Sequence, residues 1–563
     1  MMRHRHVNLW SPLSSVGVLV GTLIFAATLT PTLGLRTSLP QGVLSGGGFA
    51  IGYGIGAFAG WLWTFMELPP PGMRTQRIAA RMVAVCCAAI AIGFLWLSNG
   101  WQDSVRKLMD VAPVSSAHAL VVVALAATTA LVLIALARLF ALVLRAVAAL
   151  IGRFVPRRIA NVTSAVVAFV LLWLLATDVI MGVAFRVLDA SYQQYDALIE
   201  PERLQPTAPL KTGSAASLLS WNDLGRAGRE FVSSGPGARA IEALSRHPAQ
   251  EPIRVYVGLR AADTAHERAR LALAELKRVD AFNRAALIVI TPTGTGWVDP
   301  AAIDSVEYLY NGDIASVAVQ YSYLSSPLSL LVLPDYGARS ARALFDEIYG
   351  YWTSLPKDRR PKLYLHGLSL GAMNSEQSAH LLDTVGDPFQ GALWSGPPFT
   401  SKLWRSFTDA RNPGSPSWLP QIRDGALVRF MNQNGVGQDG RWGPMRIVYL
   451  QYASDAITFF DYSSLYRKPD WMMAPRGPDV SPALRWRPVV TFLQLALDLA
   501  TATTTPPGYG HVYAAPHYLD AWLAVTGIQG WSAEDLARLK RHLAAAQARG
   551  ESDPSSAYVD RGG

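Results

Sequence analysis

Ser369 is the residue of this sequence best placed to act as a nucleophile. It lies in Gly367-Leu368-Ser369-Leu370-Gly371, a serine between two glycines in the order G-x-S-x-G. A serine hydroxyl is a weak nucleophile, which needs a base to take its proton and N–H donors to receive the developing negative charge. Glycines at this spacing permit a sharp, crowded turn that exposes the serine between a strand and a helix. The alternative is a small residue in a structural turn.

A histidine after Ser369 is expected to be the base, because serine, acid and histidine follow one another in this order where such a turn carries a triad. Four histidines follow Ser369. His511 fits best, since it lies beside Gly510 in the loop PPGYGHVY, and His517 is the alternative. The other two, expected within a helix that turns them away or in a charged, solvated helix, are His380 and His542.

The acid is expected at the end of a late strand. Asp455 ends the run MRIVYLQYASD, and Asp461 follows as the alternative. A carboxylate there would orient the imidazole of the base and stabilise its charged form. The competing interpretation of Asp455 is a helix N-cap.

Backbone N–H groups must receive the negative charge of the substrate. One is expected from Leu370, directly after the serine, and the other from the glycine-rich turn TPTGTGW, at Thr293, Gly294 or Thr295. The competing interpretation of this turn is a phosphate-binding loop, but no Walker lysine follows and no G-x-G-x-x-G is completed. The sequence predicts no metal site and no cofactor.

These residues need a scaffold, and the sequence from 251 to 545 alternates apolar strands with helical periodicity. This pattern predicts an α/β doubly wound domain with a parallel sheet covered on both faces, whose strand ends gather the site residues. The predicted strands are 253–259, 285–297, 315–324, 362–369, 391–398 and 445–455, and the predicted helices are 267–279, 338–352 and 373–385.

The first third of the chain is almost entirely apolar. Half of all residues are hydrophobic and 16% are charged, against about 25% in a typical soluble protein. We therefore expect an all-α transmembrane bundle over 1–190, then a connector over 191–250 and, after the catalytic domain, a polar disordered tail over 546–563. A membrane helix needs about 20 mostly apolar residues. The five candidate spans are Val16–Leu35, Val43–Met66, Met82–Leu97, Ala119–Leu144 and Val162–Phe185.

Basic residues in the short loops predict the orientation of this bundle. Arg74, Arg77 and Arg81 lie in one loop, and such loops stay in the cytoplasm. With five spans, the catalytic domain is then extracytoplasmic, on a multi-pass protein of the cytoplasmic (inner) membrane. The net charge of +9 comes largely from arginines beside apolar segments, so it indicates topology and a lipid partner rather than nucleic acid.

The second span carries a row of small residues on one helix face. Small residues allow close helix approach, either within one bundle or between two copies in a homo-oligomer. The four glycines, each four positions from the last, are Gly48, Gly52, Gly56 and Gly60.

Longer stretches resemble a known family. RVYVGL, TPTGTGWVDP, YLHGLSLGA and PPGYGHVY, together with LPQGVLSGGGFAIGYGIGAFAGW near the N-terminus, resemble the membrane-anchored bacterial alpha/beta-hydrolase family 9 and its N-terminal membrane domain. The resemblance implies an alpha/beta-hydrolase catalytic domain with the nucleophile at Ser369, the acid at Asp455 and the base at His511. Leu368 is a departure, because the family often has glutamate before the serine.

The leading hypothesis is a membrane-anchored serine hydrolase of the esterase or lipase type, acting on an acyl ester, thioester or lipid-like substrate. An acyltransferase would use the same acyl-enzyme with an envelope lipid or glycan as acceptor. A non-catalytic receptor or assembly factor on a hydrolase fold is the alternative from another class.

Overall fold

The computed structural model describes residues 13–552, apart from 70–71, 116, 152–195, 202, 325–328, 330–334, 380–383 and 437. These residues form two compact units, each described here by itself. The first unit comprises the N-terminal part of the chain as far as Val187 and two later segments, Asp461–Pro469 and Val480–Asp498. The second unit contains the remainder of the chain from Leu188 onward.

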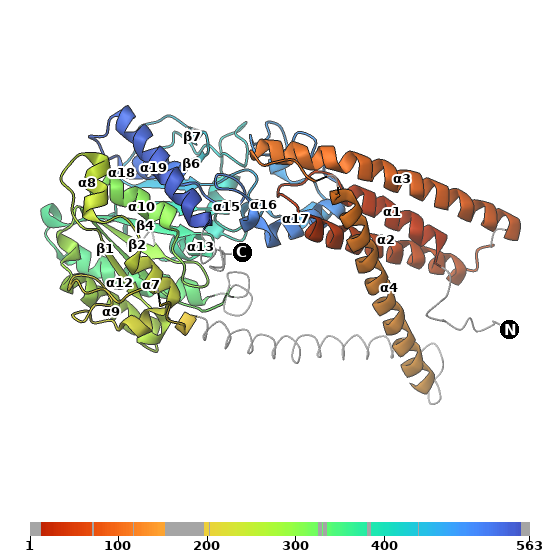
Figure 1. The fold of residues 1–563 in the computed structure, drawn as a ribbon, viewed down its shortest axis with the longest axis horizontal. Coiled ribbons are helices and arrows are strands. Elements are labelled where there is room, and N and C mark those ends of the chain that lie inside the picture. The colour runs from red at the N-terminus through yellow and green to blue at the C-terminus, as the bar shows by residue number, and fades with distance from the viewer. Residues whose placement is uncertain are drawn as a thin grey trace. The chain divides into compact units, whose positions relative to one another are not determined.

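The first unit is a bundle of apolar helices (Figure 1). Three of them are long and apolar enough to cross a membrane, which indicates a membrane protein. Its N-terminal helices among the described residues are α1 (Ser15–Thr28), α2 (Ser38–Phe65), α3 (Met73–Leu108) and α4 (His118–Ile151), and most of α17 (Val490–Ala500) also belongs to this unit.

The helices differ in length from the predicted spans. α1 ends at Thr28 rather than Leu35, and with 14 residues it is shorter than a span requires. Pro31, which cannot donate a helical hydrogen bond, follows that end within the predicted span. α3 is longer than predicted, because the helix continues through the polar residues that flank its apolar centre. The predicted span Val162–Phe185 lies outside the described residues.

Glycines of α2 pack against α1. A Cβ atom at Gly52 would lie 2.7 Å from the carbonyl oxygen of Val20, and one at Gly56 would lie 2.6 Å from that of Val16. A Cβ at Gly48 would come within 2.9 Å of Thr28. This geometry favours a seam within one bundle over a contact between two copies.

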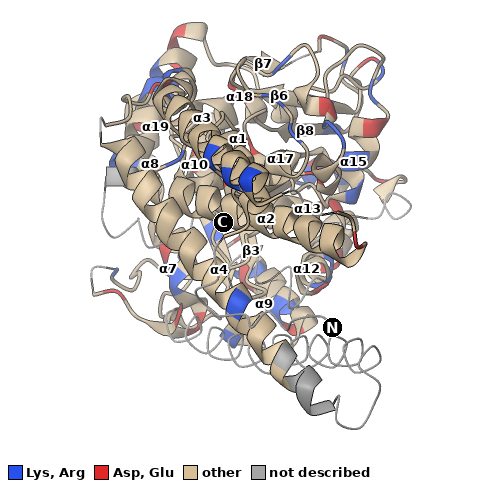
Figure 2. Cartoon of the chain, turned by 90° about the vertical axis from the view of Figure 1, so that its right-hand side faces the viewer, with Lys and Arg blue, Asp and Glu red and all other residues tan. Residues whose placement is uncertain are grey.

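Charge is distributed unevenly along the bundle. Figure 2 shows Lys and Arg gathered on the first turns of α3, where Arg74, Arg77 and Arg81 lie, whereas most of the neighbouring helix surface carries no charge. Such a distribution is typical of a helix that begins at the cytoplasmic face of a membrane.

The second unit is built on an eight-stranded sheet in the order β1-β3-β2-β4-β5-β8-β6-β7. All neighbouring pairs are parallel except β6 with β7. Most strands are buried along their whole length, which is why they read as continuous apolar runs. The strands are β1 (Ile253–Val257), β2 (Ala286–Thr291), β3 (Ile314–Val319), β4 (Lys362–Leu368), β5 (Gly391–Ser395), β6 (Val428–Asn432), β7 (Gly435–Val436) and β8 (Arg446–Leu450).

Helices pack on the sheet in two groups. α9 (Ala265–Arg278) and α12 (Tyr336–Ser354) pack together and on β3, and α12 also contacts α13 (Leu370–Glu376). α18 (Ala515–Thr526) packs on β5 and β8 and contacts α10 and α19. The other helices of this unit are α7 (Gly225–Ser233), α8 (Ala238–Ser245), α10 (Pro300–Leu309), α15 (Lys402–Asp409), α16 (Ala456–Phe459) and α19 (Ala533–Ser552).

The expected α/β doubly wound domain is thus confirmed, and the six predicted strands each overlap an observed one. The pairing of β6 and β7 at the sheet edge was not predicted. α19 continues to Ser552, so the chain is still helical past residue 546, where the polar tail was expected to begin.

Candidate active site

Ser369 lies at the tight turn between β4 and α13. Its backbone has φ 57° and ψ −125°, a conformation that a residue with a side chain seldom adopts. The N–H of Ser369 donates to the carbonyl oxygen of Ser395 on the neighbouring strand β5, at 2.9 Å. The turn therefore presents the serine at the carboxyl end of a central strand, as the sequence predicted.

Both glycines of the G-x-S-x-G pattern are needed for this turn. A Cβ atom at Gly371 would lie 2.2 Å from the carbonyl oxygen of Thr291. A Cβ at Gly367 would lie 2.4 Å from the backbone of Gly371 itself. The turn thus leaves no room for a side chain at position 367 or at position 371.

His511 and Asp455 form a buried pair. Nδ1 of His511 lies 2.7 Å from Oδ2 of Asp455, and the two side chains are 2% and 0% exposed. If the imidazole carries its proton on Nδ1 and donates it to the carboxylate, Nε2 is left as an acceptor. Nε2 is buried and has no hydrogen-bond partner among the described residues.

Asp455 is also the N-cap of α16, so the N-cap interpretation is confirmed, and it is compatible with the predicted role as acid. Its Oδ1 accepts from the N–H of Ile457 at 2.9 Å. Its Oδ2 accepts from the hydroxyl of Tyr513 at 2.8 Å, beside His511. Burial, followed by the charge of Asp455, raises the pKa of Tyr513 well above its ordinary value, which keeps this hydroxyl a neutral donor.

A second buried carboxylate joins the loops that carry the acid and the base. Oδ2 of Asp479 accepts from the N–H of Ser454 at 2.9 Å and from its hydroxyl at 2.5 Å. The same hydroxyl oxygen accepts from the N–H of Gly510 at 2.9 Å. Ser454 directly precedes Asp455, and Gly510 directly precedes His511. Asp479 therefore fixes the two loops against each other.

The first oxyanion donor fits its predicted place. Leu370 is the first residue of α13, and a helix offers no acceptor to the N–H of its first residue. The N–H of Thr293 already donates to the carbonyl oxygen of Trp297 at 3.0 Å within the turn, so it is engaged and not directed at an oxyanion in this structure. Thr293 lines the pocket described below, whereas Gly294 and Thr295 are not among the described residues that line it. The oxyanion role stays a prediction for both donors.

The alternatives for base and acid lie elsewhere. Nδ1 of His517 is 2.7 Å from the hydroxyl of Tyr452. Asp461 caps a short 3-10 helix by accepting from the N–H of Ser463 at 2.8 Å. His542 is half-buried rather than solvated, with Nε2 3.1 Å from the hydroxyl of Tyr308, and His380 lies outside the described residues.

Comparison with known families identifies the family of this chain. Residues 253–539 match the family model described as "Alpha/beta-hydrolase family", and residues 29–236 match the one described as "Alpha/beta-hydrolase family N-terminus". The chain belongs to the alpha/beta-hydrolase family. Comparison with curated proteins finds no match, and comparison with solved structures finds none either. Membership supports a hydrolase-type function and confirms family 9, which the sequence motifs suggested.

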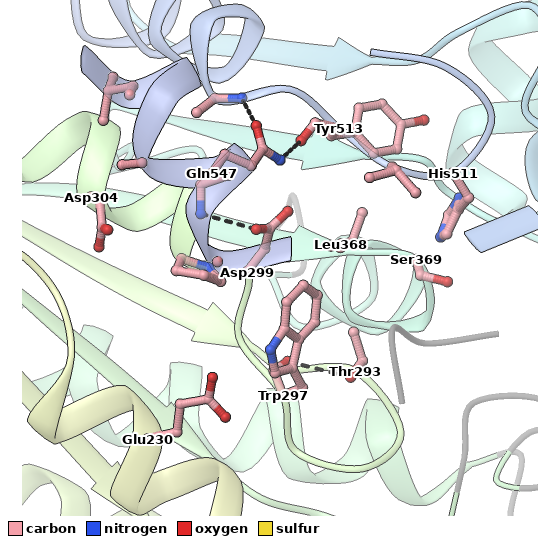
Figure 3. A pocket seen from close by; sticks show the side chains of 17 residues that line it. Glu230, Thr293, Trp297, Asp299, Asp304, Leu368, Ser369, His511, Tyr513 and Gln547 are labelled. Carbon is pink, nitrogen blue, oxygen red and sulfur yellow. Dashed lines mark hydrogen bonds between the residues drawn. The ribbon is translucent and has the colours of Figure 1, made fainter. Parts of the chain in front are cut away.

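The hydrolase has a pocket of about 220 Å³ at this site. Ser369 and His511 lie at one end of it, and Glu230 and Asp304 lie toward the other (Figure 3). Between them the lining includes Trp297 and Leu368 together with the carboxylate of Asp299, and over the whole pocket more of the lining surface is apolar than polar. No group of three or more metal-binding side chains occurs among the residues that the structure describes.

Sequence reasoning missed several residues that support this hydrolase site. Tyr513 and Ser454 lie within the runs PPGYGHVY and MRIVYLQYASD, whereas Asp479 lies in neither, and only the folded loops reveal how these residues contact the loops of His511 and Asp455. Ser454 and Tyr513 lie close to Asp455 and His511 in the chain, which is a weak sequence signal for their roles. Asp479 has no such signal in the sequence.

Proposed function

We propose that the protein is a serine hydrolase of the esterase type, which cleaves a carboxylic ester or thioester through an acyl-Ser369 intermediate. The observation that carries the proposal is the buried His511–Asp455 pair, whose histidine lines the same pocket as a serine held at positive φ. A non-catalytic receptor would have no need for a strained serine beside a buried imidazole with an open acceptor nitrogen.

The reaction follows from these groups. Nε2 of His511 takes the proton of the Ser369 hydroxyl as Oγ attacks the acyl carbon, and Asp455 stabilises the resulting imidazolium. The N–H of Leu370 donates to the oxyanion of the tetrahedral intermediate. His511 then protonates the departing alkoxide or thiolate, which leaves the acyl group on Oγ. Water, deprotonated by the same imidazole, attacks the acyl carbon and releases the acid, and Oγ regains its proton.

Transfer of the acyl group to an envelope lipid or glycan remains the alternative. It shares every step up to the acyl-enzyme, and then an acceptor alcohol replaces water. Product analysis with and without added glycerol or a sugar as acceptor separates the two: hydrolysis gives only the free acid, whereas transfer gives a new ester.

We also propose that the catalytic unit faces away from the cytoplasm, and contacts inside the helical unit support this orientation. α1 and α2 run antiparallel, since Gly17 lies beside Tyr53 and Thr28 beside Ser45. The first turns of α3, with their arginines, follow the end of α2. The segment Val480–Asp498 contacts the opposite end, at the turn between α1 and α2.

Two contacts fix that segment. Asp498 pairs with Arg36, which lies in the turn after α1, at 2.9 Å. Ser481 lies 3.2 Å from Ser104, near the far end of α3. If the arginines at the start of α3 are cytoplasmic, this segment and the catalytic chain on both sides of it are on the outer side of the membrane.

One experiment tests nucleophile and orientation together. A fluorophosphonate probe should label the wild-type chain and fail to label Ser369→Ala, while Ser354→Ala, an exposed serine at the end of α12, should label normally. A membrane-impermeant form of the probe should label intact cells as fully as lysed ones. Persistent labelling of Ser369→Ala would refute the nucleophile, and labelling only after lysis would refute the orientation.

A further inference from the structure

The C-terminal helix α19 forms one wall of the pocket that holds Ser369 and His511. The residues of this helix that line the cavity are Leu543, Ala546, Gln547 and Gly550. Their spacing of three and four positions places them on one helix face. Figure 3 shows Gln547 of this face beside Asp299 and Tyr513, within the same pocket.

The wall is fixed to the loop that carries the base. Oε1 of Gln547 accepts from the N–H of Ala515 at 2.9 Å, and its Nε2 donates to the carbonyl oxygen of Tyr513 at 2.9 Å. Leu543, one turn earlier, is 4% exposed. The helix face therefore has a defined position relative to His511, which lies two residues before Tyr513.

The cavity suits a small, mainly apolar group. Its volume of about 220 Å³ lies below the roughly 300–1,000 Å³ of pockets that bind drug-sized ligands. The carboxylates of Glu230 and Asp304 lie toward the end away from Ser369 (Figure 3). A long alkyl chain that reached them would bring methylene groups against carboxylates, at the expense of their hydration.

The wall also lies outside the part of the chain that matches the family. The family match ends at residue 539, whereas the lining residues of α19 begin at Leu543. The family match therefore does not extend to this part of the pocket wall.

We propose that α19 closes an acyl pocket for short, uncharged acyl groups, and that Ala546 sets the length of acyl chain that this pocket accepts. The inference rests on the proposed serine hydrolase function, since it assigns the pocket to the acyl part of the substrate. A methyl side chain at this position leaves space in the cavity that a larger side chain would fill.

The test compares acyl chain lengths in the full-length protein. The ratio of kcat/KM for the hexanoyl and acetyl esters of p-nitrophenol should fall at least about tenfold in Ala546→Leu, because one methylene in such a pocket changes the rate constant by about 10-fold or more. Ala545→Leu is the matched control, since this neighbouring residue is exposed and does not line the cavity. Its ratio should equal that of the wild type.

A second variant covers the case in which Ala546→Leu fails to fold. A Cβ atom at Gly550 would meet nothing within 4 Å, so Gly550→Leu adds bulk to the same wall without a clash at its first atom. It should lower the same ratio. An unchanged ratio in whichever of the two variants folds, or an equal fall in Ala545→Leu, would overturn the assignment of the wall.

Labelling separates this outcome from failure of the proposed function. Ethyl and hexyl fluorophosphonates should both react with Ser369 in the wild type, and the hexyl probe should lose more rate than the ethyl probe in Ala546→Leu. Reaction of both probes with no difference between the variants would refute the acyl pocket alone. No reaction of Ser369 with either probe, together with no ester hydrolysis, would refute the serine hydrolase and with it the pocket.

Discussion

The carboxylate of Asp455 illustrates how single residues combine roles in this site. One oxygen holds the first turn of α16, and the other holds His511 and Tyr513. Because α16 begins directly after Asp455, this residue is fixed both by its own side chain and by the helix that follows. The predicted acid and the predicted N-cap are therefore the same structural feature, which the sequence alone could not reveal.

Glu376 is a buried acid at the end of α13 whose ionisation should govern the pH dependence of stability. Burial raises its pKa from 4.5 to about 7, although the hydroxyl of Ser401 donates to it. The unfolded chain releases this proton near pH 4.5 and the folded chain only near pH 7. The contribution of Glu376 to the free energy of unfolding is therefore fully present below pH 4.5 and is lost as the pH rises to about 7. This loss lowers the free energy of unfolding by about 3 kcal/mol.

Glu376→Gln should remove this contribution to the pH dependence. The wild type in detergent should lose thermal stability between pH 5 and pH 8, and the variant should lose less of it. Asp387→Asn, at a partly exposed carboxylate that pairs with Arg360, serves as a comparison for the effect of removing one charge. Parallel melting curves for wild type and Glu376→Gln over this pH range would contradict the prediction.

At the scale of the elements, continuous apolar runs predicted the central strands because those strands are buried on both faces. β6 was missed, because Arg429 and Asn432 interrupt its apolar character. α17 (Val490–Ala500) carries an ordinary apolar pattern, and only its contacts show that nearly all of it belongs to the helical unit. The wall formed by α19 was missed for a similar reason, since periodicity reveals a helix face but not the cavity that it borders.

The turn between β4 and α13 allows a direct test of one predicted element. Gly371→Ala should place its Cβ against the carbonyl oxygen of Thr291 and destabilise the fold by about 3 kcal/mol, because the backbone on both sides is fixed. Fluorophosphonate labelling of Ser369 should be lost together with part of the thermal stability. Gly350→Ala on α12 is the control, since a Cβ there meets nothing within 4 Å and alanine favours the helix.

If Gly371→Ala were labelled and melted like the wild type, the claim that this turn has no room for a Cβ at position 371 would be wrong. Loss of labelling with full stability would instead indicate that Gly371 matters for the geometry of Ser369 rather than for folding. The two readouts thus distinguish a packing role from a positioning role, and Gly350→Ala should change neither.

At the scale of the whole molecule, the chain passes between the two units several times instead of completing one before it enters the other. Asp455 and His511, the proposed acid and base, belong to the hydrolase unit, but between them the chain enters the helical unit twice, at Asp461–Pro469 and Val480–Asp498. A boundary near residue 190, where the composition changes, therefore describes only the first passage. The catalytic loops are joined by a segment that packs among apolar helices.

A buried ion pair holds that segment in the helical unit, and its removal should show how much the segment depends on it. Asp498 and Arg36 are both 0% exposed and lie 2.9 Å apart, and Asp498 also accepts from the hydroxyl of Thr32 and the N–H of Leu33. Asp498→Leu leaves Arg36 buried without its partner. Such a loss costs about 3–5 kcal/mol, whereas replacing both members of a pair often costs little.

The double variant Arg36→Met/Asp498→Asn should therefore recover most of the stability that Asp498→Leu loses, because asparagine still accepts from Leu33 and no charge stays buried. Thermal unfolding of the full chain in detergent measures both. Asp470→Asn tests an exposed pair with Arg411 and should change stability by less than about 1 kcal/mol. Since the segment joins the acid loop to the base loop, labelling of Ser369 should fall in Asp498→Leu and return in the double variant. Stability and labelling that stay at wild-type values in Asp498→Leu would mean that this segment does not depend on the ion pair.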